Sequence, residues 1–168
     1  MRDLEQLPWT LTHGDLIPSN ILVDSETSCI VGLLDWAEAE WLPFGVGLYG
    51  LEELLGEEVG GVFVYFPEAR KLRRLFWRQL LSHVPELRAN PQLLSTVKEA
   101  QILGVLLWHG IAFDDGRLDR VVEKEIDDAE ISRLDAMLLG RSGLRPIKTC
   151  RERLALSFRD LCGFLVGK

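Results

Sequence analysis

Residues 13–20 read His-Gly-Asp-Leu-Ile-Pro-Ser-Asn, and an apolar run that ends at Asp35 follows them. An aspartate, an asparagine five positions later and a second aspartate behind an apolar strand match the order and spacing of a kinase catalytic loop and its metal-binding aspartate. This pattern constrains the fold strongly, because Asp15, Asn20 and Asp35 share one site only if the chain turns back between them. It indicates phosphoryl transfer as the chemistry.

The segment between Asn20 and Asp35 has the pattern of a hairpin. Two short apolar runs, residues 21–23 and residues 30–34, lie on either side of the polar residues 24–28. Apolar runs separated by a turn-like cluster predict two antiparallel strands. Such a hairpin begins after Asn20 and ends before Asp35, so it brings these two residues close in space.

The remainder of the chain has the apolar spacing of helices. We expect helices over residues 48–55, with Gly56 as the stop, over residues 68–84 behind Pro67, over residues 92–111 behind Pro91, from Asp127 and Asp128 to Gly140, and over residues 151–165. The expected fold is α+β and mainly α, in a single domain spanning residues 1–168, with a small β-hairpin that carries the catalytic and metal-binding loops.

The three motif residues suit the separate tasks of phosphoryl transfer, which requires mainly placement and charge neutralisation. A carboxylate beside the attacking hydroxyl orients it and accepts its proton, and Asp15 is the candidate for this base. Mg²⁺ prefers hard oxygen ligands. The amide oxygen of Asn20 and the carboxylate of Asp35 are therefore the candidate metal ligands, and no nucleotide-binding residue is identifiable.

The His-Gly-Asp-x-x-x-x-Asn pattern, followed by a strand and Asp35-Trp36, resembles the aminoglycoside phosphotransferase and choline kinase-like family. Residues 7–9 and 35–45 are similar to its fungal-type branch. The resemblance implies the C-terminal lobe of a protein-kinase-like fold, with ATP and Mg²⁺ as cofactors and a small-molecule hydroxyl as acceptor.

Residue roles follow from the same resemblance. In that family the motif aspartate is the catalytic base, whereas the asparagine and the later aspartate bind magnesium. These roles are implied for Asp15, Asn20 and Asp35. His13 occupies the position of the motif histidine and is implied to brace the loop rather than to react.

The motif lies close to the start of the chain, with twelve residues before His13 and the first lysine, Lys71, after it. A kinase-like fold has a β-rich lobe ahead of the catalytic loop, which carries a glycine loop and a lysine. We therefore expect a C-terminal lobe alone: a fragment, a truncated family member, or a chain that takes its other lobe from a second chain. Such a lobe is expected to bind ATP feebly at best.

A second hypothesis is non-catalytic. The chain is then an inactive truncated remnant, or a binding or scaffold module of the same fold. The missing upstream lysine and glycine loop favours this hypothesis for the isolated chain. An exposed apolar patch around residues 7–9 and the hairpin would indicate a lost lobe, and such a face would promote self-association.

The charge distribution bears on the partners. Residues 3–69 contain thirteen Asp and Glu and no Lys or Arg, whereas residues 70–168 contain eighteen Lys and Arg and thirteen Asp and Glu. This acidic front half argues against nucleic acid, because phosphate binding needs clustered basic side chains. It suits metal cations and a cationic acceptor, with a surface that serves only solubility as the alternative.

Localisation is expected to be cytoplasmic. The N-terminus has no signal-peptide pattern, and the longest apolar run, residues 102–113, is too short to span a bilayer. The three cysteines are scattered, as is typical of free thiols in a reducing compartment. We expect no membrane partner.

Residues 45–50 match Gly-x-Gly-x-x-Gly, the pattern of a nucleotide-binding loop. The residues at 41–43 are expected to interrupt a strand, and Arg70 stands where an acidic ribose ligand would lie. The segment also follows the catalytic loop instead of preceding it. A loop-to-helix turn is the favoured interpretation.

Other side chains give weaker expectations. Glu38 and Glu40 are candidates to face a substrate, with a solvated surface as the alternative. Trp36 and Trp41 are expected to pack in the core beneath the metal loop. His109, within an apolar helical stretch, is expected to be a core or edge histidine.

Overall fold

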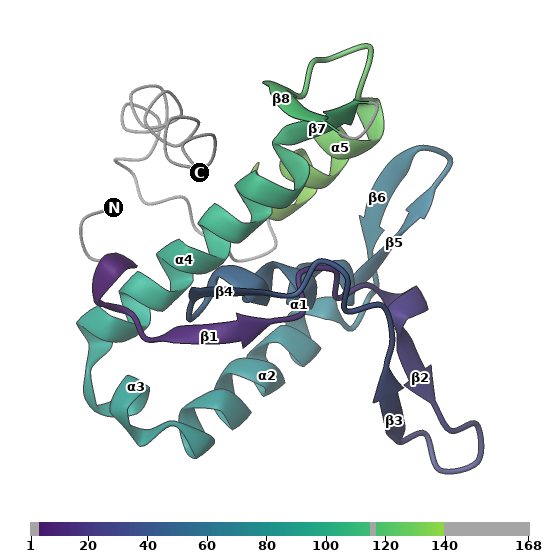
Figure 1. Ribbon diagram of the computed structural model, residues 1–168. Helices are drawn as coiled ribbons and strands as arrows, with labels where there is room; N and C mark the ends of the chain where they lie inside the picture. Colours follow the sequence, from purple (N-terminus) through teal and green to yellow (C-terminus); the bar gives the residue numbers. More distant parts are fainter. Residues whose placement is uncertain (1–3, 115–116, 140–168) are drawn as a thin grey trace.

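The computed structural model describes residues 4–114 and 117–139 (Figure 1). Strands pair in four two-stranded antiparallel sheets: β1 (Trp9–Thr12) with β4 (Glu40–Pro43), β2 (Ile21–Val23) with β3 (Ile30–Leu33), β5 (Gly56–Val59) with β6 (Val62–Tyr65), and β7 (Ile111–Asp114) with β8 (Arg117–Val121). The α-helices are α1 (Tyr49–Glu53), α2 (Ala69–His83), α3 (Pro85–Ala89), α4 (Pro91–His109) and α5 (Asp128–Leu134). Short helical turns are η1 (Leu4–Gln6), η2 (Pro18–Asn20), η3 (Val46–Leu48) and η4 (Asp135–Leu139). The fold is therefore α+β.

Helix α4 is the central element of the described chain. Pro91 lies in its first turn, and the Asn90 side chain accepts a hydrogen bond from the Leu93 amide at 3.0 Å. Both features favour the start of a helix. Figure 1 shows α4 running from α3 to β7, and on its way it packs against η1, η3 and α1. Neither α4 nor any other described helix has the length and apolarity needed to cross a membrane.

Two apolar clusters form the core, and α4 contributes to both. The first contains Leu4, Leu7, Val46, Leu87, Val97 and Ala100. The second contains Tyr49, Phe63, Val105 and Met137. Since residues of η1 and η3 pack in the first cluster and Tyr49 of α1 in the second, both flanks of the motif segment rest on α4.

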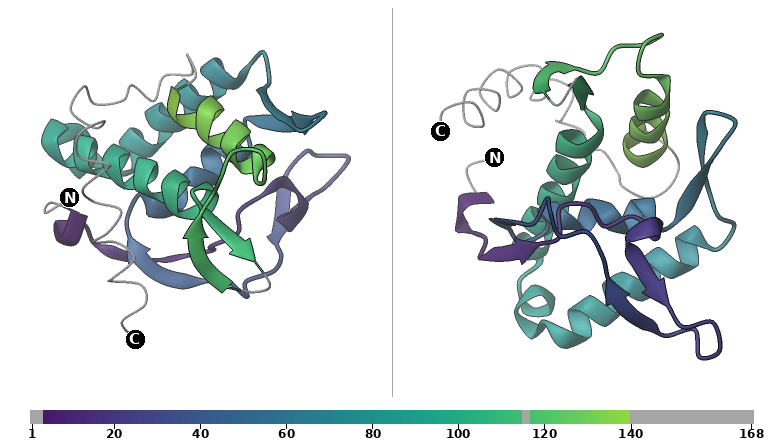
Figure 2. Two further views of the ribbon diagram at one scale, coloured as in Figure 1. Left: turned by 90° about the horizontal axis from the view of Figure 1, so that it is seen from above. Right: turned by 45° about the vertical axis from the view of Figure 1, so that its right-hand side comes forward.

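The β2–β3 hairpin expected between Asn20 and Asp35 is confirmed. Ile21 pairs with Leu33 and Leu22 with Gly32, and the register shifts before Val23. The β2–β3 hairpin extends away from the helices (Figures 1 and 2), whereas β6 of the β5–β6 hairpin packs against α5. The apolar side chains of β2–β3 are consequently exposed to solvent.

Strand β4 corrects the expectation that residues 41–43 interrupt a strand. Leu11 pairs with Trp41, and Trp9 pairs with Pro43 at the end of the ladder. Proline is tolerated at such a position, because a two-stranded sheet has only edge strands and the missing N–H need not face a partner. The Gly-x-Gly-x-x-Gly segment at residues 45–50 therefore does follow a strand, contrary to the argument from sequence.

The long helices α2 and α4 match their predictions closely, whereas the short helix α1 does not. Helices α2 and α4 lie within one or two residues of the expected ranges, although Ile111 begins β7 instead of ending α4. Helix α1 ends at Glu53, and Gly56 begins β5 instead of stopping a helix. A Cβ on Gly56 would lie 2.6 Å from the Val64 carbonyl oxygen, so the glycine permits close strand pairing.

The β5–β6 hairpin was not predicted, although the sequence contains its turn signal. Gly60 and Gly61 connect the strands with φ values of 61° and 80°, as the favoured two-residue hairpin turn requires. Helix α5 begins at Asp128, as expected. The expected helix end at Gly140 and the expected helix over residues 151–165 lie outside the described residues.

Candidate active site

The open end of the β2–β3 hairpin joins the two halves of the motif. The Leu34 amide donates to the Asn20 carbonyl at 2.8 Å, one step beyond the pairing of Ile21 with Leu33. Asn20 therefore lies opposite the residue that precedes Asp35. The hairpin thus places the segment of Asn20 beside the segment of Asp35.

Asp24 organises the opposite end of the hairpin. Its Oδ1 accepts hydrogen bonds from the Thr27 hydroxyl at 2.7 Å, the Thr27 amide at 2.7 Å and the Glu26 amide at 3.1 Å. The bonds from Thr27, first of all that from its side chain, hold the pKa of the Asp24 carboxyl below its usual range. An ordered turn fixes the strand register, and with it the position of Asn20 relative to Leu34.

His13 connects the motif loop, residues 13–20, to the end of β3. Its Nδ1 accepts a hydrogen bond from the Asp15 amide at 3.3 Å, so the other ring nitrogen, Nε2, carries the hydrogen and donates to the Leu34 carbonyl at 2.8 Å. The side chain is buried, and its ring lies 4.6 Å from the ring of Trp36. His13 thus has contacts on both halves of the motif and no free nitrogen for a reactive role.

Asn20 is bonded directly to Asp15. Its Nδ2 donates to the Asp15 carboxylate Oδ2 at 2.8 Å and to the Asp15 carbonyl at 2.9 Å. Both partners only accept hydrogen bonds, so the amide nitrogen must face them. The amide oxygen of Asn20 takes no part in these bonds, which suits a role as a neutral metal ligand.

Asp35 has an unusual backbone conformation. Its φ of 55° lies in the left-handed region, which aspartate adopts more readily than most residues. The preceding Leu34 is held at its amide by Asn20 and at its carbonyl by His13. The Asp35 side chain is exposed, and its Oδ1 accepts a long hydrogen bond of 3.4 Å from the Ala37 amide. This carboxylate is therefore available to a ligand.

Gly14 lets the segment after Asp35 pack against the catalytic loop. Its φ is 81°, and a Cβ would lie 2.0 Å from the Glu38 carbonyl oxygen. Only glycine fits both this conformation and this close approach. The motif glycine is therefore needed to bring the Asp35 loop down onto Asp15.

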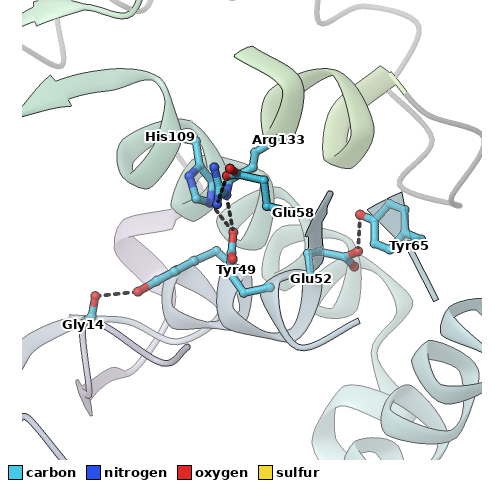
Figure 3. Close-up of polar contacts among 8 residues, drawn as sticks. Gly14, Tyr49, Glu52, Glu58, Tyr65, His109 and Arg133 are labelled. Carbon is cyan, nitrogen blue, oxygen red and sulfur yellow. Dashed lines mark hydrogen bonds and ion pairs between the residues drawn. The ribbon is translucent and has the colours of Figure 1, made fainter. Parts of the chain in front are cut away.

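Tyr49, which was not identified from the sequence, reaches the same loop. Its hydroxyl donates to the Gly14 carbonyl at 2.5 Å, as Figure 3 shows. The tyrosine lies 35 positions further along the chain. The local signal near Tyr49 is the glycine-rich segment of residues 45–50, which contains it. The sequence favours a loop-to-helix turn for this segment and does not indicate a contact with Gly14.

The aromatic side chains beside the motif are more exposed than expected. Trp36 is 48% exposed and Trp41 is 63% exposed, so the prediction that both pack in the core is wrong. Strand β4 directs Trp41 outward, and Trp36 covers only one face of His13. Glu38 and Glu40 are both exposed, as either a substrate-facing or a solvated position requires.

Among the described residues, Glu52 and Glu53 of α1 each take part in a buried polar network, of which Figure 3 draws the contacts to Tyr65 and His109. Glu52, which is fully buried, accepts hydrogen bonds from Arg73 of α2 and from the Tyr65 hydroxyl. Its neighbour Glu53 has its Oε1 2.8 Å from His109 Nε2. His109 is therefore a buried residue of the core with an acidic neighbour, as expected for a core histidine, and it lies outside the motif.

A metal ion at the motif would need Asn20 as well as Asp35. Within residues 4–114 and 117–139, no three side chains of His, Cys, Asp or Glu come together as a metal site. The candidate ligands at the motif are the carboxylate of Asp35 and the neutral amide oxygen of Asn20, whereas Asp15 is the candidate base. This all-oxygen set has the chemistry that magnesium prefers and lacks the sulfur and nitrogen ligands that are typical of zinc.

Comparison with known families finds a match that covers the front of the chain. The family model described as "Phosphotransferase enzyme family" matches residues 2–50 of the 168. The matched segment includes the whole motif and ends just after Tyr49. No curated protein and no solved structure matches the chain.

Proposed function

We propose that this chain carries the catalytic lobe of an ATP- and Mg²⁺-dependent phosphotransferase that acts on a hydroxyl group of a small molecule. We also propose that the chain is the C-terminal lobe of a protein-kinase-like fold. Within the aminoglycoside phosphotransferase and choline kinase-like family, we assign it to the fungal-type branch. The main support for the proposal is the hydrogen-bonded connection of Asp15, Asn20 and the Asp35 segment at the base of one hairpin.

The proposed base is Asp15. In the transfer, the bond between the γ-phosphorus and the bridging oxygen of ATP breaks, and a new P–O bond forms to the acceptor oxygen. The hydroxyl proton passes to the Asp15 carboxylate, and ADP leaves. The bond from Asn20 engages Oδ2 of Asp15, which orients the carboxylate, and orientation is the main contribution that a protein makes to this reaction.

The proposed metal ligands are the Asn20 amide oxygen and the Asp35 carboxylate. Asn20 directs its nitrogen to Asp15 and keeps its oxygen out of that contact. Asp35 is exposed and is held in a left-handed conformation. When bound, Mg²⁺ supplies positive charge that neutralises the phosphate oxygens of the nucleotide.

The proposed acceptor is a cationic or amine-bearing alcohol. Exposed acidic side chains at Glu38 and Glu40 follow Asp35 closely, and no lysine or arginine occurs in residues 3–69. A negative field of this kind attracts cations and repels anionic acceptors. Aminoglycosides and choline, the acceptors implied by the family resemblance, share this chemistry.

The test is phosphate transfer from γ-labelled ATP to a panel of cationic and neutral alcohols in the presence of Mg²⁺. Because this lobe alone is expected to bind ATP feebly, the assay uses a high ATP concentration, and we expect slow transfer to a cationic acceptor by the unmodified chain. Asp15→Ala should reduce the rate at least 100-fold, a typical effect of losing a general base. The control is Glu26→Gln, which removes an exposed charge at the far end of the same hairpin. Wild-type turnover by Asp15→Ala would reject the role of Asp15.

A second candidate function is a non-catalytic binding or scaffold module, and one observation favours it. The β1–β4 sheet turns apolar side chains outward: Trp9, Leu11 and Trp41 are each more than half exposed. Thr10 and Thr12, on the opposite face of β1, are partly buried. A sheet whose apolar face is exposed to solvent is typical of a surface that another polypeptide covers. Absence of phosphate transfer with every acceptor would favour this candidate.

A further inference from the structure

Tyr49 is a buried tyrosine whose polar end meets the catalytic loop. It is 3% exposed, and its ring is stacked against Trp108 of α4 with centroids 4.8 Å apart and planes inclined by 20°. Its hydroxyl donates to the Gly14 carbonyl at 2.5 Å. A buried tyrosine hydroxyl normally finds a hydrogen-bond partner, and here the partner is the backbone that leads into Asp15.

The bond is one of two that hold a single peptide group. The Gly14 carbonyl and the Asp15 amide are the two ends of the peptide bond that joins these residues. Tyr49 binds the carbonyl, and His13 Nδ1 accepts from the amide. Because the peptide is planar, fixing both ends fixes the orientation of the Asp15 backbone and hence the direction in which its side chain leaves.

The glycines of residues 45–50 allow this contact. A Cβ on Gly47 would lie 2.4 Å from Thr12 Cγ2, and a Cβ on Gly50 would lie 3.0 Å from the Leu16 carbonyl oxygen. These two neighbours flank Gly14 in the sequence. The absence of side chains on η3 and α1 therefore lets them lie directly against residues 12–16, which brings the Tyr49 hydroxyl within reach.

The environment keeps Tyr49 in the donor form. Burial, and after it the negative charge of Asp15, raises the pKa of the Tyr49 phenol. Glu53 and Glu38 raise it further, whereas the backbone hydrogen bond involving Leu16 lowers it. A neutral phenol is required here, because the Gly14 carbonyl can only accept.

We propose that Tyr49 is a positioning residue for the catalytic loop, and that the glycine-rich segment 45–50 is the surface on which this loop rests. Tyr49 acts on Asp15 through the Gly14–Asp15 peptide group and touches no reacting atom. Because Asn20 is bonded to both the backbone and the carboxylate of Asp15, a displaced Asp15 also displaces Asn20. This inference rests on the proposed function in one respect: the displacement of Asn20 weakens metal binding only if Asn20 is a metal ligand.

The test compares Tyr49→Phe with Tyr65→Phe by amide NMR spectra and Mn²⁺ titration. Tyr49→Phe removes only the hydroxyl and keeps the ring against Trp108. Tyr65→Phe removes a hydroxyl that belongs to another buried network. That hydroxyl donates to Glu52 at 2.7 Å. We expect Tyr49→Phe to shift the amide signals of Gly14, Asp15 and Asn20 and to weaken Mn²⁺ binding about threefold to tenfold, in line with the loss of one hydrogen bond. Tyr65→Phe should leave both unchanged.

A second variant applies if Tyr49→Phe does not fold. Gly50→Ala keeps the hydroxyl but adds a Cβ 3.0 Å from the Leu16 carbonyl oxygen, so it should shift the same amide signals by a smaller amount. Unchanged signals at residues 14, 15 and 20 in the folded variants would overturn the inference. A wild-type chain that does not bind Mn²⁺ at Asn20 and Asp35 would instead count against the proposed function, while the amide shifts would still test the positioning role.

Discussion

Gly14 lies where the segment after Asp35 packs against the motif loop. A Cβ there would meet the Glu38 carbonyl oxygen at 2.0 Å, and the φ of 81° is itself unfavourable for other residues. Gly60 separates the effect of the left-handed backbone from the effect of the close neighbour. Its φ is 61°, but nothing lies within 4 Å of a Cβ built on it. We expect Gly60→Ala to lower the free energy of unfolding by about 1 kcal/mol and Gly14→Ala to lower it clearly more. Equal losses in urea denaturation would show that the close approach of Glu38 is unimportant.

Tyr49 is expected to make the stability of the folded chain decline at alkaline pH. A raised pKa of the phenol in the folded chain means that the unfolded chain loses this proton first as the pH rises. The stability that Tyr49 contributes is therefore present below the unfolded pKa of about 10 and declines above it. We expect the free energy of unfolding of the wild type to fall more steeply above pH 10 than that of Tyr49→Phe. Parallel curves would argue against a buried neutral phenol.

Contacts within the motif follow from the sequence, whereas contacts made by side chains far along the chain do not. Asp15 and Asn20 are five positions apart, and His13 and Asp15 are two apart, so local spacing suffices to predict their proximity. Tyr49 reaches Gly14 only because α1 packs against it. The exposure of Trp41 was likewise unpredictable, because apolar character indicates a tendency to be covered and not which segment covers the side chain.

At the scale of elements, the buried pair of Glu52 and Arg73 connects α1 to α2. Arg73 Nε donates to Glu52 Oε1 at 2.8 Å, and both side chains are at least nine-tenths buried. Removing one partner leaves a buried charge, which typically costs about 3–5 kcal/mol. We expect Arg73→Leu to lose roughly this much stability in urea denaturation, and the exposed neighbour Arg74→Leu to change little. Similar values for both variants would contradict a structural role for the pair.

Local elements could be predicted from the sequence better than pairings between distant segments. The β2–β3 hairpin has its turn residues between its strands, and α2 and α4 have long apolar periodicity behind a proline. The pairing of β1 with β4 joins residues about thirty positions apart, and no local pattern specifies it. Pro43 was misleading, because proline excludes a central strand but not the end of an edge strand.

At the scale of the whole molecule, the exposed face of β1–β4 predicts association. Trp9, Leu11 and Trp41 lie on this face and are each more than half exposed. We expect the apparent mass in gel filtration to rise with protein concentration, and the double substitution Leu11→Ser with Trp41→Ser to abolish the rise. Ile126→Ser, which alters an equally exposed apolar residue beside α5, should retain it. A constant monomeric mass would count against association through this face.

We propose that Asp15, Asn20 and Asp35 act together as one metal-dependent phosphotransfer site. Mn²⁺, a paramagnetic substitute for Mg²⁺ at oxygen ligands, tests it most directly through broadening of amide NMR signals. We expect selective broadening around residues 15, 20 and 35. This broadening should be lost in Asp35→Asn and retained in Glu26→Gln, at the other end of the same hairpin. Broadening that spreads evenly over the acidic surface, or that survives Asp35→Asn, would contradict this proposal.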